Sequence, residues 1–255
     1  MRVDINCDMG ESFGAYEIGA DAEVLPHVTS ANIACGFHGG DPAVMRTTVA
    51  AALKLGVAVG AHPGLPDLVG FGRRAIQVTP QEVYDLIIYQ VGALLGFARA
   101  AGTELQHVKP HGALYNMAAA QPPLAEAVAR AVRDADRGLV LYGLAGSHLL
   151  AAAERAGIPA ASEAFADRNY IHDGSLVSRQ RPDALVTDVD EAVRRAVRMV
   201  KEGVVADVDG EDIPIRADTV CLHGDGPNAA ELARRLRDGL QRAGVEVKAP
   251  GRSRK

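Results

Sequence analysis

The stretch ANIACGFHGGDP, residues 31–42, decides the fold because it contains one complete strand-to-helix unit of a parallel α/β protein. Its first half, up to Cys35, is apolar and is typical of a buried strand. Glycines and His38 follow, and Asp41-Pro42 then has the form of a helix N-cap with proline in the first turn. The stretch therefore predicts a strand that ends in a glycine-rich polar loop, with a helix directly after it.

The same order of a short apolar run and a longer helical pattern recurs along the chain. Apolar residues in the longer segments return every three or four positions, as on the buried face of a helix. This alternation predicts parallel strands joined by right-handed crossovers, and it leaves both an open sheet and a closed barrel as alternatives. The expected strands cover residues 2–7, 30–35, 57–61, 105–109, 139–142, 160–163 and 219–222. The expected helices cover residues 42–55, 80–101, 122–134, 147–156, 189–201 and 228–242.

Residues 1–248 are expected to form a single domain, since 255 residues suit one α/β barrel. Asp209-Gly210 lies between two short β-like runs, which predicts a hairpin inserted at residues 204–216. The polar residues 249–255 are expected to form a flexible C-terminal tail.

Composition argues against two classes of partner. The net charge is −5 without a basic block, and aromatic residues make up 4% of the chain, so we expect no nucleic acid partner. The apolar stretch at residues 83–98 contains Asp85 and Gln90 and has helical rather than membrane character, so we expect no membrane partner. The N-terminal residues lack the pattern of a signal peptide, and the three widely spaced cysteines suit buried free thiols, which together predict a cytoplasmic protein.

Four of the eight histidines lie beside glycine or proline at the C-terminal ends of expected strands: His38, His62, His111 and His223. The carboxyl ends of parallel strands meet on one face, where sites of α/β proteins are built. Histidine and carboxylate clusters bind divalent metals or transfer protons, and the sequence leaves both alternatives open. Acidic residues are expected on the same face, at Asp4, Asp8, Glu11, Glu163, Asp167 and Asp225.

Two further features bear on charge. Lys109 precedes His111 by two positions on the same strand, so when buried it must pair with an acid or face an anionic ligand. Arg73 follows the sequence Gly70-Phe71-Gly72, which resembles a dinucleotide fingerprint but follows a loop rather than a strand. Arg73 is therefore interpreted either as a contact for a carboxylate or phosphate, or as a solvated surface residue.

Six motifs together resemble the LamB/YcsF family. They are DINCDMGE (4–11), ANIACGFHGGDP (31–42), GAHPGLPDLVGFGRR (60–74), VKPHGALYN (108–116), EAFADRNY (163–170) and CLHGDGP (221–227). Ala164 stands where valine is expected in the family, an exchange of one apolar residue for another. The resemblance implies an α/β fold, an irregular seven-stranded (β/α) barrel of the glycoside hydrolase/deacetylase type. It also implies a hydrolase that works with 5-oxoprolinase subunits B and C, opening 5-oxo-L-proline (pyroglutamate) to L-glutamate with ATP hydrolysed to ADP and phosphate.

The resemblance and the strand-end pattern together suggest roles for the site residues. Asp8 or His62 is the expected base that activates water, His38 and His111 are expected acids or phosphate donors, and Lys109 stabilises negative charge. The backbone amides of residues 36–40 are expected to help bind an anion. ATP, with Mg²⁺, is expected to be used by the whole complex. The expected substrate-binding residues are Asn6, Glu11, Gly39, Arg73, Asp167, Arg168, His223 and Asp225.

Two other functions fit the same sequence. The first is an autonomous metal-dependent deacetylase or amidohydrolase, with Asp8, His38 and His62 as the expected metal ligands. The second is a non-catalytic subunit that binds 5-oxoproline for a partner. The sequence also leaves open whether the chain forms a homo-oligomer.

Overall fold

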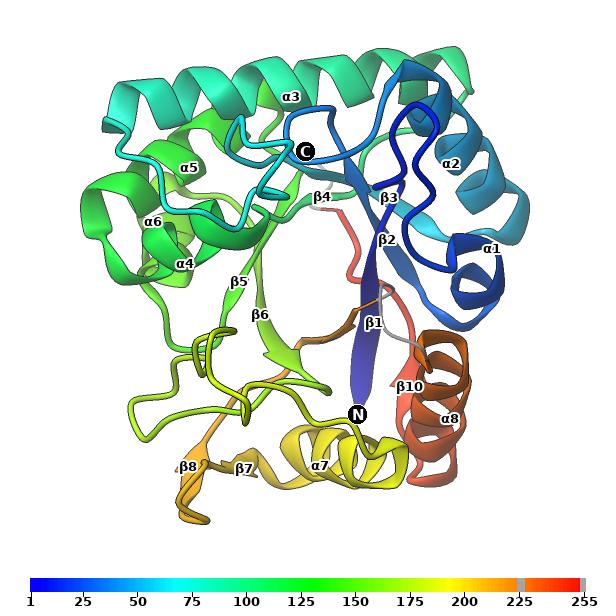
Figure 1. The fold of residues 1–255 in the computed structure, drawn as a ribbon, viewed down its shortest axis with the longest axis vertical. Coiled ribbons are helices and arrows are strands. Elements are labelled where there is room, and N and C mark those ends of the chain that lie inside the picture. The colour runs from blue at the N-terminus through cyan, green and yellow to red at the C-terminus, as the bar shows by residue number, and fades with distance from the viewer. Residues whose placement is uncertain (224–227, 253–255) are drawn as a thin grey trace.

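Parallel strands close into a barrel in the computed structural model of this chain, which describes residues 1–223 and 228–252 (Figure 1). The barrel closes because its last strand, residues 219–222, pairs with both the preceding barrel strand, residues 160–165, and the first strand, residues 2–9. This confirms the seven-stranded parallel barrel and decides between the barrel and the open sheet. The strands, in barrel order, are β1 (Arg2–Met9), β2 (Ser30–Ala34), β3 (Ala58–His62), β4 (His107–Val108), β5 (Val140–Leu144), β6 (Ala160–Phe165) and β9 (Thr219–Leu222).

Helices surround the barrel, and the local sequence determines where they begin. Helix α2 (Pro42–Leu55) begins as expected, because the Asp41 carboxylate accepts hydrogen bonds from the amides of Ala43 and Val44 at 2.8 and 2.9 Å. It ends at Gly56, whose φ of 68° is the left-handed conformation of a helix C-terminus. The others are α1 (Asp21–Val24), η1 (Leu25–His27), α3 (Pro80–Ala100), α4 (Gly112–Ala120), α5 (Pro122–Ala135), α6 (His148–Ala156), α7 (Val189–Glu202) and α8 (Ala229–Arg242).

Short elements complete the fold outside the barrel. β7 (Val204–Ala206) and β8 (Asp212–Pro214) form an antiparallel hairpin, and β10 (Glu246–Val247) extends the sheet beside β1. Arg252, within the segment expected to be a flexible tail, forms ion pairs with Glu104 and Asp136. The chain is therefore anchored as far as this residue.

Helix α3 is long and apolar enough to cross a membrane by length and composition alone. Figure 1 shows it lying along the outside of the fold above α5, and the amide of Gln90 holds it to the barrel. That amide accepts from the Gly64 nitrogen and donates to the Gly64 oxygen, both at 2.9 Å. A helix bound to a barrel loop in this way is typical of a helix that packs on a protein core.

The barrel interior is polar, unlike the apolar shell between the barrel and the helices. The fully buried Asp4 accepts hydrogen bonds from the hydroxyls of Tyr142 and Thr219 at 3.0 and 2.6 Å. Burial raises the pKa of Asp4 despite these hydrogen bonds. Above this layer, His107 Nε2 lies 2.7 Å from Asn32 Oδ1, and its ring stacks on Tyr142 with centroids 4.2 Å apart. This layered network supports the functional end of the barrel from below.

His107 should make the stability of the protein depend on pH. Burial, and then the charge of Lys109, lowers the pKa of His107 to about 3. Between the ordinary value of about 6.5 and about 3, the unfolded chain binds a proton at this residue that the folded chain does not. Unfolding free energy should therefore fall on acidification, by about 1.4 kcal/mol per pH unit from this residue. Urea unfolding of the wild type and a His107→Gln variant between pH 7 and 5 checks this. Equal slopes for the two proteins would contradict it.

Candidate functional site

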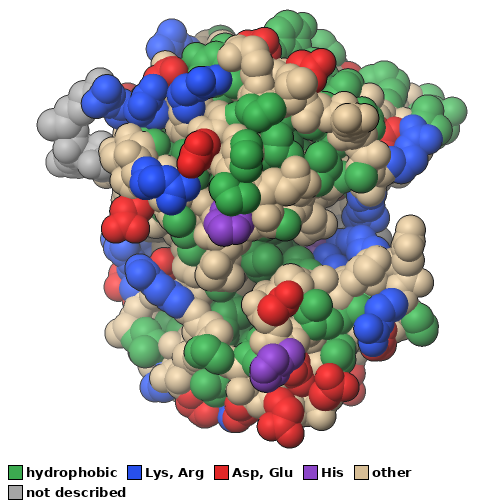
Figure 2. All heavy atoms as spheres, turned by 90° about the vertical axis from the view of Figure 1, so that its left-hand side faces the viewer, with side chains coloured by type: hydrophobic (Ala, Val, Ile, Leu, Met, Phe, Trp, Pro, Cys, Tyr) green, Lys and Arg blue, Asp and Glu red, His purple; other side chains and the backbone are tan. Residues whose placement is uncertain are grey.

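The C-terminal ends of the barrel strands open into a cavity of about 880 Å³. Asp8, His62 and Lys109 line it from the barrel, and residues 173–180 line it from a loop after β6. Figure 2 shows the face where α4 to α6 and this loop meet, with a hollow between them and Lys or Arg side chains beside it. A cavity of this volume is in the range of small-molecule sites.

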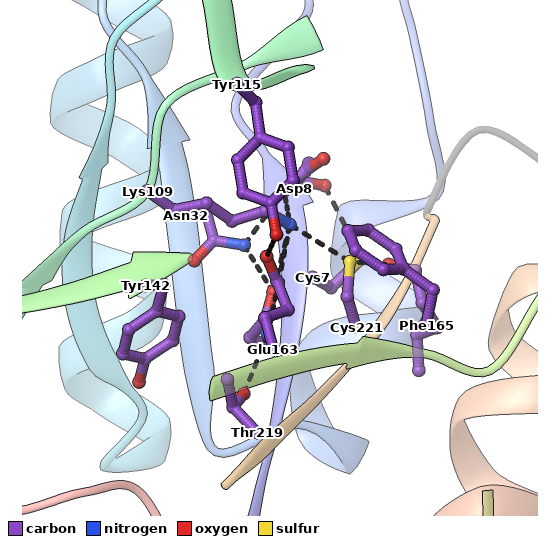
Figure 3. Close-up of polar contacts among 12 residues, drawn as sticks. Cys7, Asp8, Asn32, Lys109, Tyr115, Tyr142, Glu163, Phe165, Thr219 and Cys221 are labelled. Carbon is purple, nitrogen blue, oxygen red and sulfur yellow. Dashed lines mark hydrogen bonds and ion pairs between the residues drawn. The ribbon is translucent and has the colours of Figure 1, made fainter. Parts of the chain in front are cut away.

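The buried ammonium group of Lys109 is the centre of the charged site (Figure 3). Its Nζ lies 3.0 Å from both Asp8 Oδ1 and Glu163 Oε1, and it donates to Asn6 Oδ1 at 3.2 Å and Cys221 Sγ at 3.0 Å. One cation thus faces two carboxylates in a space with almost no solvent contact. The expectation that a buried Lys109 pairs with acids is confirmed.

The charges of this centre hold one another ionised. Burial alone would lower the pKa of Lys109, but Asp8, Cys221 and Glu163 outweigh it and raise that pKa well above its ordinary value. Burial alone would raise the pKa of Asp8, but His62 and Lys109 outweigh it and lower that pKa well below its ordinary value. Asp8 is therefore a permanent carboxylate at neutral pH, and it lines the cavity.

Two residues that sequence reasoning did not assign to the site, Asn32 and Tyr115, hold these carboxylates in place. Asn32 Nδ2 donates to Asp8 Oδ1 at 2.8 Å, and Tyr115 Oη donates to Glu163 Oε2 at 2.7 Å. Glu163, noted in the sequence only as a strand-end acid, is fully buried and pairs with Lys109. Asn6 supports the same carboxylate, donating to Glu163 Oε1 at 2.9 Å from inside the barrel, so it lies beneath the cavity rather than on its wall.

Beside Asp8, three histidines and a glutamate converge in a second buried group. Glu11, His38, His62 and His111 each offer a ligand atom, and these atoms all lie within 4.8 Å of one another. The rings of His38 and His111 stack with centroids 3.7 Å apart, and His62 meets both edge-on. Burial lowers the pKa of His38 and of His111 well below the ordinary value, which favours neutral imidazoles.

Close backbone approaches fix these rings. A Cβ on Gly64 would lie 2.5 Å from His38 Nδ1, and one on Gly72 would lie 2.7 Å from the His38 Cβ, so only glycine fits at either position. Phe71 has a φ of 54°, a left-handed conformation that is uncommon for a bulky residue. Its carbonyl oxygen lies 2.8 Å from His111 Nε2. The loop at residues 64–72 therefore sets the positions of two of the three histidines.

Of the other expected site residues, Arg73, Arg168 and His223 line the cavity, and Asp167 contacts His223. Asp167 accepts from the His223 backbone amide, and it lies 3.0 Å from the ring Nδ1 of His223. Arg168 donates to the Val177 and Ala184 carbonyls, so its guanidinium holds the loop after β6. Arg73 lines the cavity. Asp225 lies outside the described residues.

The glycine-rich loop after β2 differs from the expected anion cradle. The amide of Gly36 donates to the Gly39 carbonyl at 2.8 Å, and the amide of Gly40 donates to the Glu11 carbonyl at 3.4 Å. A Cβ on Gly39 would lie 2.9 Å from that same Glu11 oxygen. These glycines bring the loop close to Glu11, and two of their amides already donate hydrogen bonds, one within the loop and one to Glu11.

The Glu11 cluster could hold a divalent metal ion. The set differs from the expected Asp8, His38 and His62, because Glu11 and His111 join His38 and His62. Asp8 lies beside this set, with Oδ1 facing Lys109 and Asn32 and Oδ2 3.3 Å from His62 Nε2. The free thiols expected from the sequence, Cys7, Cys35 and Cys221, are all buried.

Known proteins resemble this chain along nearly its whole length. The profile of the LamB/YcsF family matches residues 3–255. A Tolumonas auensis protein, named as the A subunit of 5-oxoprolinase, is 61% identical over 248 residues, covering 97% of this chain and 99% of the relative. A Bacillus subtilis protein of the same name is 57% identical, covering 97% and 96%. The crystal structure of a lactam utilization protein from Thermus thermophilus superposes with a TM-score of 0.92 at 51% identity, covering 98% of this chain and 100% of the other.

Proposed function

Because this chain belongs to the LamB/YcsF family, we propose that it is the A subunit of a cytoplasmic, ATP-dependent 5-oxoprolinase. With subunits B and C it opens the lactam of 5-oxo-L-proline to L-glutamate, and ATP hydrolysis drives the reaction. The observation that carries the proposal is the ionised Asp8, which lines the cavity and contacts both Lys109 and His62.

Hydrolysis of a lactam requires a base for the attacking water and positive charge near the carbonyl oxygen. Asp8 is the better candidate for the base than His62. Both ring nitrogens of His62 are engaged, Nδ1 with the Lys109 carbonyl at 2.7 Å and Nε2 with Asp8 and His111. Lys109 supplies a fixed cation beside this base and lines the same cavity, where it stabilises negative charge that develops on the substrate.

The leaving amine needs a proton when the lactam C–N bond breaks. His223 is well placed to give it, because its Nδ1 faces Asp167 while the ring lines the cavity. A carboxylate partner of this kind orients the ring. His111 has both ring nitrogens engaged, and His38 does not line the cavity among the described residues, so the expected role of these two as proton donors is replaced by the role proposed below.

Substrate recognition requires a contact for the carboxylate of 5-oxoproline. Arg73 lines the cavity and is the candidate for this contact. Arg168 also lines the cavity, but its guanidinium donates to the Val177 carbonyl, so it acts by fixing the loop at residues 173–180. The chain contains no GxxxxGK[ST] sequence, so the proposal places no Walker-type nucleotide site in this subunit.

A reconstitution experiment tests the proposal. The chain is mixed with purified subunits B and C, 5-oxoproline and MgATP, and glutamate and ADP are followed while each component is omitted in turn. We expect equal amounts of the two products, and no glutamate when this chain is left out. Glutamate formation without this chain would reduce it to a binding subunit.

The Glu11 cluster favours one second candidate, an autonomous metal-dependent amidohydrolase. That function requires the chain alone to hydrolyse an amide or acetyl substrate without ATP, and it requires a chelator to inhibit the reaction. The omission series above separates the two functions, because only the second gives product without subunits B and C.

A further inference from the structure

The four ligand atoms of the Glu11 cluster all lie within 4.8 Å of one another, close to the spacing that a metal ion requires. A tetrahedral Zn²⁺ ion with ligands at about 2.1 Å places those ligands about 3.4 Å apart. His38 Nε2 lies 3.3 Å from Glu11 Oε1, His111 Nδ1 lies 3.6 Å from the same oxygen, and His111 Nδ1 lies 2.9 Å from His62 Nε2. These three distances bracket the required value, and the other pairs lie within 4.8 Å, so modest side-chain shifts would bring all four atoms into coordination.

Two hydrogen bonds that point away from the Glu11 cluster determine which ring nitrogens of His62 and His111 carry a proton. The other nitrogen of each ring faces the cluster as an acceptor. His62 Nδ1 lies 2.7 Å from the Lys109 carbonyl, and His111 Nε2 lies 2.8 Å from the Phe71 carbonyl. A carbonyl oxygen only accepts, so each of these outer nitrogens carries the proton. In the neutral rings, His62 Nε2 and His111 Nδ1 are then both lone-pair atoms, and they face each other at 2.9 Å. Such a contact needs a cation between the two nitrogens.

A single proton on His62 Nε2 would satisfy this contact and the 3.3 Å contact with Asp8 Oδ2, but it would not reach His38. His38, which is fully buried, has no hydrogen-bond partner on either ring nitrogen within the described part of the chain. Its Nε2 points at the same centre as the other three ligand atoms. A divalent ion accounts for all four atoms, and outer-side hydrogen bonds from histidine to carbonyl groups are the usual support of metal-bound imidazoles.

We propose that Glu11 Oε1, His38 Nε2, His62 Nε2 and His111 Nδ1 bind a divalent first-row transition metal ion of the Zn²⁺ class. Three imidazoles suit such an ion, whereas Mg²⁺ prefers an all-oxygen shell. His62 and His111 also line the cavity, which gives the ion a path from solvent. When bound, the ion would supply a Lewis acid next to Asp8.

Metal binding by the isolated chain tests this proposal independently of the proposed activity. The purified chain is freed of metal with a chelator, and one metal-free sample is titrated with Zn²⁺ by calorimetry. A separate metal-free sample is loaded with Co²⁺ and its visible absorption is recorded. We expect one ion per chain and intense Co²⁺ bands of the kind that four-coordinate sites give. His111→Ala should weaken binding by more than about 100-fold, since loss of an outer-shell partner alone costs about 10–100-fold.

Two further variants keep the test decisive. Glu11→Gln retains the shape of the side chain and should weaken binding at least about 10-fold even when His111→Ala fails to fold. His172→Ala is the matched control, because this histidine is exposed and lies outside the cluster, and its affinity should equal that of the wild type. Failure to bind Zn²⁺, or unchanged affinity in Glu11→Gln, would overturn the proposal. So would an NMR signal for a proton on His62 Nε2 that persists in saturating Zn²⁺.

Discussion

A Lys109→Met variant should lose about 10³-fold in 5-oxoproline-dependent ATP hydrolysis when assayed with subunits B and C. Lys109 is the buried cation between Asp8 and Glu163. Methionine has similar length but no charge, so the variant cannot stabilise negative charge on the substrate. Turnover number and KM, measured with 5-oxoproline varied and ATP saturating, check the prediction.

Loss of folding is the competing explanation for an inactive Lys109→Met protein. Removing one partner of a buried ion pair typically costs about 3–5 kcal/mol, because the other charge stays buried and uncompensated. The double variant Lys109→Met/Glu163→Gln removes one carboxylate as well and should regain part of that stability without regaining activity. Lys201→Met, at an exposed lysine on α7, is the matched control and should resemble the wild type. A folded Lys109→Met protein with turnover within about 10-fold of wild type would contradict the assigned role.

The strand-to-helix transitions were predictable because their signals are local. Asp41-Pro42 begins α2 as the sequence indicates, and Thr79-Pro80 begins α3 with a capping box completed by Glu82. Helix α4 was not predicted. Its N-cap, His111, makes no side-chain capping hydrogen bond, so the start of this helix lacks a local signal. Barrel closure depends on the pairing of β1 with β9, about 215 residues apart, and no local pattern reports it.

The site was predictable as a set of strand ends but not as a set of contacts. Strand order brings Asp8, His62 and Lys109 to one cavity, as the alternation of strands and helices indicates. The sequence does not show that Asp8 is shared between Lys109 and His62, while Glu11 lies among the three clustered histidines. Which acid faces which base depends on the directions of the side chains beyond the strand ends. Three-dimensional packing sets those directions. Asn32 and Tyr115 were overlooked for the same reason, since a buried amide and a buried phenol read as core residues in the sequence.

Asp8→Asn should lower the turnover number by about 10²-fold, the low end of the range for general-base catalysis. The low end applies because Lys109 and His62 hold the pKa of Asp8 well below its ordinary value, and a carboxylate with a lowered pKa is a weaker base. The variant should fold, since Lys109 keeps Glu163 as its partner and the asparagine oxygen can still accept from Lys109. Steady-state turnover at pH 7, with circular dichroism as the folding check, measures the effect.

Glu163→Gln is the matched comparison that separates base catalysis from charge balance. Both variants remove one carboxylate from Lys109, but Asp8 lines the cavity and Glu163 is fully buried beneath it. If Asp8 only balances the lysine charge, the two variants should lose turnover equally, and that result would exclude it as the base.

The two roles of Asp8, as a base and as a charge partner of Lys109, also differ in their pH dependence. A carboxylate with a lowered folded pKa stabilises the protein above its unfolded pKa of about 3.9, and this stabilisation is lost as the pH falls through the folded value. In Asp8→Asn, the free energy of unfolding should therefore fall less steeply at acidic pH than in the wild type. A loss of turnover that persists at neutral pH reports the missing base.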